Sequence, residues 1–153
     1  MPEKKGDKKK ILLVEDEAIM AAAEKDDLEE KGYLVRHVLS GEAAVDLVKE
    51  EPDSCDLILM DINLGSGMDG TEAARIILSD RELPVVFLSS HTEPEVVEKT
   101  EEITSYGYVV KNSGIVVLDA SIKMAFRLFE AKMAEQEKTE QLHVIKENLS
   151  DIF

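Results

Sequence analysis

Charged and hydroxyl side chains directly follow four short apolar runs of this sequence. They are Glu15 and Asp16 after residues 11–14, Asp61 after 57–60, Ser89 after 84–88 and Lys111 after 108–110. Clustered carboxylates repel one another and favour a hard divalent cation such as Mg²⁺, which takes oxygen ligands. A carboxylate can also accept a phosphoryl group as an aspartyl phosphate. That transfer requires neutralisation of the phosphoryl oxygens, which a metal, an ammonium and a hydroxyl can provide.

These side chains can meet only if the apolar runs form neighbouring parallel strands. The runs predict strands over 11–14, 33–38, 56–60, 84–88 and 108–110, and the intervening patterns predict helices over 17–31, 41–51, 71–78, 94–103 and from 115 past 129. Strands that alternate with helices indicate an α/β domain with a parallel sheet. Ligands bind beyond the carboxyl ends of such strands. Taken singly, Asp16 could cap a helix and Lys111 could be a solvated lysine, but their shared place at strand ends favours one site.

Composition limits the possible classes of protein. The chain has 153 residues, 44% of them apolar, which predicts one domain with tails. Its net charge of −15 argues against binding of nucleic acid or an anionic membrane. No apolar run approaches the roughly 18 residues of a membrane span, and the single Cys55 fits a reducing, cytoplasmic setting. Residues 1–9, rich in lysine, are expected to be a disordered leader.

A glycine pattern offers a competing interpretation. Gly65, Gly67 and Gly70 match the G-x-G-x-x-G fingerprint of a dinucleotide-binding turn. That fingerprint should follow the first strand and open its helix, whereas these glycines follow the third apolar run. We therefore expect them to form a loop over the site. His37 and His91 lack the partner spacing of metal ligands, although His91 lies beside the expected pocket and could tune the hydrolysis of a phosphate there.

Four motifs in order, ILLVEDE, LILMDINL, VVFLSS and YVVK, resemble the receiver domain of two-component response regulators. The resemblance covers residues 10–130 and implies a flavodoxin-like, doubly wound sheet of five parallel strands in the order 2-1-3-4-5, with helices on both faces. It also implies a switch that a histidine kinase or phosphotransfer protein phosphorylates in the presence of Mg²⁺, rather than a metabolic enzyme. The fourth helix, fifth strand and fifth helix would form a possible homodimer face.

The resemblance assigns roles to individual residues. Asp61 corresponds to the phospho-accepting aspartate, and Glu15 and Asp16 to the acidic pair that binds Mg²⁺ with it. Asn63 occupies the position whose backbone carbonyl completes the metal shell. Ser89, Tyr108 and Lys111 correspond in turn to the switch hydroxyl, the switch aromatic and the family's lysine.

The sequence departs from the family pattern at two places. Gly65 stands where the family usually has proline, and Asn112 follows Lys111 where the family has a proline in a cis peptide bond. A cis bond without proline costs about 2.5–4 kcal/mol, so we expect the Lys111–Asn112 bond to be trans or strained. This departure affects the placement of Lys111 but not that of Asp61.

Two other function classes remain open. A pseudo-receiver would keep the pocket but would never be phosphorylated. An aspartate-based phosphatase of the haloacid-dehalogenase type also uses an aspartate at a strand end, but it needs a second carboxylate two residues later, where this chain has Asn63. The switch fits the missing carboxylate better.

The segment 131–153 is expected to be a helical extension. It carries an apolar stripe at Leu142, Ile145, Leu149 and Ile152. IKENLSDIF resembles the opening of a PAS sensory domain, and the stretch around His143 resembles the phospho-accepting box of a sensor kinase. A coiled coil between two copies is an equal alternative. We expect the chain to be the N-terminal part of a multidomain signalling protein.

Overall fold

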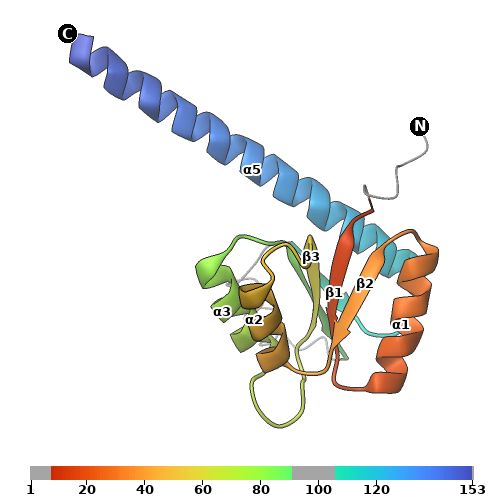
Figure 1. The fold of residues 1–153 in the computed structure, drawn as a ribbon. Coiled ribbons are helices and arrows are strands. Elements are labelled where there is room, and N and C mark those ends of the chain that lie inside the picture. The colour runs from red at the N-terminus through yellow and green to blue at the C-terminus, as the bar shows by residue number, and fades with distance from the viewer. Residues whose placement is uncertain (1–7, 91–105, 153) are drawn as a thin grey trace.

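A five-stranded parallel sheet forms the centre of the protein in a computed structural model (Figure 1). The structure describes residues 8–90 and 106–152, with side chains through residue 149. The strands are β1 (Lys10–Val14), β2 (Leu34–Val38), β3 (Leu57–Asp61), β4 (Val85–Ser89) and β5 (Tyr108–Val110). Their order is β2-β1-β3-β4-β5, and each neighbouring pair is parallel. The predicted topology is therefore confirmed.

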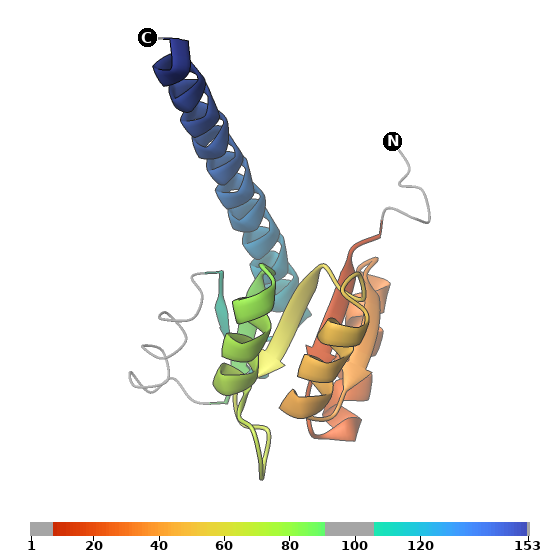
Figure 2. The ribbon, with the colours of Figure 1, turned by 60° about the vertical axis from the view of Figure 1, so that its left-hand side comes forward.

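Alternation along the strands builds two cores, one on each face of the sheet. On one face, Leu12, Ile58 and Phe87 pack with α2 (Gly41–Glu50) and α3 (Gly70–Asp80). On the other face, Leu13, Leu59 and their neighbours pack with α1 (Ala18–Glu30) and α5 (Ile115–Ile152). Figure 2 shows α2 and α3 together on their side of the sheet. Because both faces are covered, β1, β3 and β4 are apolar almost throughout.

Local signals fix the ends of the helices. The Ser40 hydroxyl accepts a hydrogen bond from the Ala43 N–H at the start of α2, and the Asp69 carboxylate accepts one from the Glu72 N–H at the start of α3. Gly32, with φ +99°, follows the end of α1 as predicted. The expected helix over 94–103 and His91 lie outside the described residues, as does most of the leader, so the labels pass from α3 to α5.

The strands place the reactive side chains at one edge. Asp61 and Ser89 are the last residues of β3 and β4, rather than the first residues after them. β3 and β4 stay paired up to these residues, because the Ile62 N–H donates to the Leu88 carbonyl at 3.0 Å. β2 lies at the sheet edge, as predicted, and its His37 pairs in register with Leu13.

α5 is much longer than the other helices. Its first half packs on the sheet, and its second half projects away from the domain (Figure 1). Near the start of α5, the Asp119 carboxylate accepts a hydrogen bond from the Tyr33 hydroxyl at 2.6 Å. This bond ties α5 to the residue that precedes the edge strand β2. Among the described residues, no helix combines the length and the apolar character needed to cross a bilayer.

Cys55 lies buried against β3, with 1% of its surface exposed. Burial raises the pKa of its thiol to about 11. The neutral thiol is therefore a packing group at this site.

Candidate phosphoryl and metal site

Three carboxylates and one ammonium meet at the carboxyl ends of β1, β3 and β5. The Lys111 Nζ atom lies 2.7 Å from the Asp61 Oδ2 atom and 3.0 Å from the Glu15 Oε2 atom. Ligand oxygens of Glu15, Asp16 and Asp61 all lie within 4.8 Å of one another. The expectation that Glu15, Asp16, Asp61 and Lys111 converge is confirmed.

Burial separates these carboxylates into two kinds. Glu15 and Asp61 are fully buried, whereas Asp16 is exposed. The pocket can therefore hold a cation between two inner carboxylates and one outer carboxylate. Oxygen ligands of this type suit Mg²⁺, which keeps part of its water shell.

The electrostatics of the pocket follow from that burial. Burial is the main reason that the pKa of Glu15 rises to about 7, although Lys111 opposes the rise. Burial likewise raises the pKa of Asp61 above its ordinary range. For Lys111, burial alone would disfavour the ammonium, but its hydrogen bonds to Asp61 and Glu15 outweigh burial and raise its pKa. One ammonium thus neutralises only part of the carboxylate charge, which leaves the pocket favourable for a divalent cation.

Backbone contacts hold the inner carboxylates in place. The Asn63 N–H donates to Asp61 Oδ1 at 3.1 Å, and the Glu17 N–H donates to Glu15 Oε1 at 3.2 Å. The carbonyl of Glu15 lies 2.7 Å from His37 Nε2. That His37 contact was not predicted, because a lone histidine on an edge strand carries no spacing signal.

The glycines of the loop after β3 allow backbone conformations and close contacts that a side chain would prevent. Gly65 and Gly67 have φ angles of +74° and +121°, which side chains disfavour. A Cβ atom on Gly70 would lie 2.0 Å from the Asp61 carbonyl oxygen, so only glycine lets α3 start against the end of β3. A Cβ atom on Gly65 would lie 3.3 Å from the Asp16 carboxylate. The loop follows the third strand, which excludes the dinucleotide fingerprint as its explanation.

Lys111 reaches the pocket without the proline of the family pattern. The described residues contain no cis peptide bond, so the Lys111–Asn112 bond is trans. Asn112 instead adopts φ +67°, a left-handed conformation that asparagine tolerates better than most residues. The turn into α5 is therefore made by Asn112 together with Gly114, whose φ is +95°.

The other three predicted site residues are Ser89 in β4, Tyr108 in β5 and Asn63 just after β3. Ser89 is buried at the end of β4, and its carbonyl accepts a hydrogen bond from the Lys111 N–H at 2.7 Å. Tyr108 is partly buried in β5 and packs against the core on the α2–α3 face. Asn63 is exposed beside Asp61.

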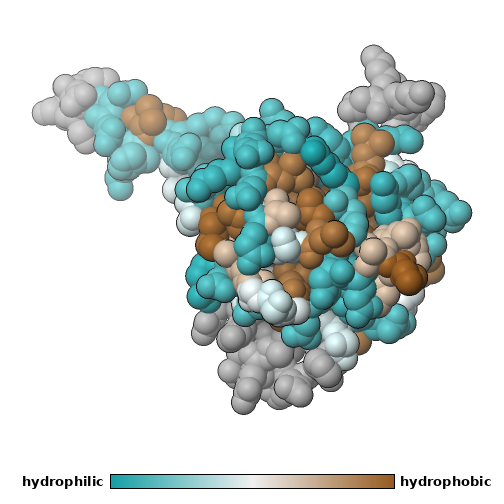
Figure 3. Space-filling view, turned by 60° about the horizontal axis from the view of Figure 1, so that its bottom comes forward, coloured by the Kyte–Doolittle hydropathy of each residue, from teal (hydrophilic) through white to brown (hydrophobic). Residues whose placement is uncertain are grey.

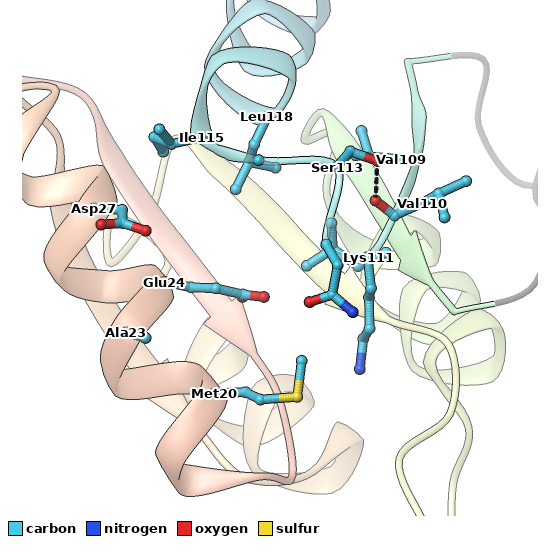
Figure 4. Close-up of a pocket in the computed structure, with 13 residues that line it drawn as sticks. Met20, Ala23, Glu24, Asp27, Val109, Val110, Lys111, Ser113, Ile115 and Leu118 are labelled. Atoms are coloured by element: carbon cyan, nitrogen blue, oxygen red, sulfur yellow. Dashed lines mark hydrogen bonds between the residues drawn. The ribbon is translucent and has the colours of Figure 1, made fainter.

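Sequence reasoning missed a cavity beside the ion cluster. It has a volume of about 300 Å³ and lies between α1 and the turn from β5 into α5 (Figure 4). Glu24 on α1 points into it from the side opposite Lys111. The Glu24 Oε2 atom is buried and has no hydrogen-bond partner among the described residues, and burial raises the pKa of this carboxyl. Helical periodicity places Glu24 on α1, but only the packing of α5 reveals the burial.

The face that carries the carboxyl ends of the strands is chemically mixed. Figure 3 shows apolar side chains on it within a rim of hydrophilic ones. A partner that docks here would therefore meet both apolar and charged surface.

Comparisons with known proteins agree with this geometry. A family model described as the response regulator receiver domain matches residues 11–123. The transcriptional regulatory protein PdtaR of Mycobacterium tuberculosis is 32% identical over 122 residues, covering 79% of this chain and 58% of that protein. AfsQ1 of Streptomyces coelicolor, also a transcriptional regulatory protein, is 32% identical over 82% of this chain and 54% of its own length. The chain thus spans little more than half the length of these relatives.

Solved structures give the same picture. The N-terminal domain of a response regulator/sensory box/GGDEF three-domain protein from Carboxydothermus hydrogenoformans is 50% identical. The match covers 82% of this chain and 99% of that domain, with a TM-score of 0.76. The receiver domain of a modulated diguanylate cyclase from Desulfovibrio desulfuricans is 32% identical over 82% of this chain and 99% of that one, with a TM-score of 0.73.

Proposed function

The chain belongs to the response regulator receiver domain family, and we propose that it is a switch that accepts a phosphoryl group on Asp61. A histidine kinase or a phosphotransfer protein would donate the group. The observation that carries this proposal is the 2.7 Å contact between Lys111 Nζ and Asp61 Oδ2 within the carboxylate cluster. It pairs a nucleophilic carboxylate with a fixed positive charge.

The chemistry is an in-line displacement. A carboxylate oxygen of Asp61 forms a bond to phosphorus while the P–N bond of the donor phosphohistidine breaks, and the leaving imidazole takes up a proton. Lys111 then stabilises negative charge on a phosphoryl oxygen, because its ammonium already lies beside the accepting carboxylate. The backbone N–H of Asn63 keeps Asp61 oriented by binding its other oxygen.

A divalent cation completes the charge balance. Glu15, Asp16 and Asp61, with the backbone carbonyl of Asn63, are the residues that would hold Mg²⁺. When bound, the ion neutralises phosphoryl oxygens during transfer. Glu15 must lose its proton to serve as a ligand, and its pKa of about 7 makes that loss sensitive to pH near neutrality.

We assign the response to phosphorylation to Ser89 and Tyr108. A phosphoryl group adds negative charge and strong hydrogen-bond acceptors next to the end of β4, where the buried Ser89 can donate its hydroxyl proton. Ser89 pairs in register with Val110, which lies two residues after Tyr108 on the neighbouring strand β5. A shift of Ser89 would therefore change the packing around Tyr108. A local charge change would thereby bias the packing of the β4–β5 side of the domain.

The test is the mass of the intact protein after incubation with Mg²⁺ and a small phosphodonor such as phosphoramidate. We expect one phosphoryl adduct in the parent chain and none in Asp61→Asn. The matched control is Asp56→Asn, which changes another aspartate of the same segment but lies outside the pocket. An adduct that persists in Asp61→Asn would contradict the proposal.

The adduct mass, together with measurements of Mg²⁺ binding and of phosphate-ester turnover, separates the alternatives. A pseudo-receiver would give no adduct and no Mg²⁺ binding. A phosphatase would turn over phosphate esters many times, for which the pocket would need a second acid; Asn63 stands in that position. We expect no multiple turnover.

The setting of the domain is also proposed. We assign residues 10–130 to the receiver and 131–153 to a signalling helix that leads to another domain of a cytoplasmic protein, as in the three-domain relative. Its output is set by that further domain. We expect no contact of this segment with nucleic acid, because its net charge is −15.

A further inference from the structure

α5 carries two apolar stripes that serve different purposes. The first consists of Leu118, Ile122 and Ala125, with Phe126 and Phe129 partly buried, and it packs on the sheet. Beyond Met133 the corresponding face becomes polar, as the run AEQEKTEQ shows. The first stripe therefore ends where the domain ends.

The second stripe, here called the outer stripe, runs along the helix and is apolar except at Ser121, Glu135 and Lys138. Its members follow strict four-three spacing and are Val117, Ser121, Met124, Leu128, Ala131, Glu135, Lys138, Leu142, Ile145 and Leu149. All the large apolar members are exposed, from 45% for Leu128 to 67% for Leu142. Apolar colour is visible on the projecting helix in Figure 3. Repetition every seven residues over several turns is the pattern of a coiled-coil seam.

Exposure of this kind calls for a partner. The helix projects from the domain, so its own domain does not cover Leu142, Ile145 or Leu149 (Figure 1). A single helix in water gains little stability without burial of an apolar face. The stripe has the same sequence in every copy of the chain, so a second copy can supply a matching stripe.

The two charged members of the stripe decide the direction of pairing. In a parallel, in-register pair, Glu135 would face its own copy and Lys138 would face its own copy, which places like charges in two neighbouring layers. In an antiparallel pair centred between Gln136 and Glu137, each Glu135 faces the Lys138 of the second copy. Only the antiparallel arrangement converts both polar layers into ion pairs.

The apolar layers also match in that register. Leu128 then faces Ile145, Met124 faces Leu149, and the small Ala131 faces the larger Leu142 of the second copy. Each layer joins one residue from the domain half of a helix with one from the projecting half of the other. The projecting half of each chain thus covers the exposed stripe on the domain of its partner.

Within the described part of the chain, the flank of α5 that carries the stripe is exposed. Asp119 bonds to Tyr33, and Phe126 lies under the Lys9 ammonium, so these two residues mark the flank that faces the β2 side of the domain. Val117, Met124 and Leu128 lie on the opposite flank and are exposed. A second helix can therefore lie along the stripe without meeting α1.

We propose that two copies of this chain pair through the outer stripe as an antiparallel coiled coil over residues 124–149. The overlap is about 38 Å long at 1.5 Å per residue. The pairing does not depend on phosphorylation of Asp61, so it can fail or succeed separately from the proposed function.

Cross-linking of cysteine variants of the full chain tests the direction of pairing. Leu128→Cys and Ile145→Cys are prepared separately, then mixed in equal amounts and treated with a short bismaleimide. We expect mixed dimers in the mixture and few in either variant alone, because positions 128 and 145 lie about 25 Å apart along one helix. Buried Cys55 does not compete, since only 1% of it is exposed.

Two outcomes would overturn the proposal. Efficient cross-linking of Leu128→Cys with itself would show a parallel pair. A lack of cross-linking in every sample, with monomers in sedimentation, would show that the stripe does not pair two copies. Both substitutions lie at exposed positions, and circular dichroism checks that each variant is folded.

Charge exchange tests the central layers independently. Glu135→Lys should weaken self-association at least tenfold, because it leaves four lysines at the centre of the antiparallel pair. Glu135→Lys combined with Lys138→Glu should restore the parent affinity by re-forming the ion pairs in reverse. If the double variant associates as poorly as the single variant, the antiparallel register is wrong.

Discussion

The protein buries charged side chains in the pocket at the carboxyl ends of the strands, and it exposes apolar side chains on the projecting half of α5. In the pocket, Glu15 and Asp61 are fully buried, whereas on the projecting half of α5, Leu142 and Leu149 are at least half exposed. Both arrangements reverse the usual distribution of side chains, and such reversals are more informative than ordinary burial. For the pocket we propose a cation as the partner, and for the helix a second copy of the same helix.

The two regions also differ in how they are held. Each inner carboxylate has a backbone N–H bonded to one oxygen and the Lys111 ammonium near the other. The projecting helix instead has local contacts, such as the 3.1 Å contact between His143 Nε2 and Glu147 Oε1 one turn apart. A change in the pocket should therefore alter the stability of the domain, whereas a change on the helix should alter association alone.

The largest expected effect comes from removing the counter-charge of the pocket. Lys111→Met should lower the free energy of unfolding by about 3 kcal/mol at pH 8, because it leaves two buried carboxylates unpaired. Urea unfolding followed by circular dichroism measures this loss.

Lys123→Met is the matched control for Lys111→Met. Lys123 forms an ion pair with Asp119 but its side chain is 63% exposed, so its loss should cost less than about 1 kcal/mol. Equal losses in the two variants would show that the pocket charges are not buried as described.

A smaller effect concerns pH. The pKa of Glu15 is raised to about 7 by burial, and protonated Glu15 does not bind a metal. Mg²⁺ affinity should therefore be roughly tenfold weaker at pH 6 than at pH 8, with a plateau above about pH 8. Calorimetric titration at several pH values measures the change.

The metal-free protein should show the opposite trend in stability. A raised folded-state pKa means that the folded chain holds the Glu15 proton more tightly than the unfolded chain. This contribution to stability is present at low pH and is lost as pH rises through about 7. Glu15→Gln should flatten both trends, and a parent protein whose Mg²⁺ affinity is the same at pH 6 and pH 8 would contradict the prediction.

The smallest expected effect distinguishes the helix from the core. Leu142→Ala should change the free energy of unfolding by less than about 0.5 kcal/mol at a concentration low enough to prevent association. Leu59→Ala removes the same atoms from a fully buried position and should cost about 3 kcal/mol. A large loss in Leu142→Ala would mean that the projecting half of α5 packs on its own domain.

Sequence patterns predicted the sheet and the four residues that converge on its edge. This was possible because a strand buried on both faces is a continuous apolar run, and because parallel strands end at one edge. Asp61, Lys111, Glu15 and Asp16 each follow or end such a run, so their meeting required no knowledge of side-chain packing.

Other features depend on packing and could not be read in this way. The burial of Glu24 arises where α1 faces the turn into α5, and the contact of His37 with the Glu15 carbonyl arises from strand register. The left-handed Asn112 resolves the missing proline in a way that the sequence left open. The outer stripe was recognised only in its last part, because near the domain the buried stripe of α5 overlaps it along the sequence.

The hydrogen bond from the Lys111 N–H to the Ser89 carbonyl has a mechanical consequence. At 2.7 Å it fastens the hydroxyl-bearing tip of one strand to the ammonium-bearing tip of the next. We therefore expect a displacement of the backbone at one strand end to be transmitted to the other strand end through this hydrogen bond.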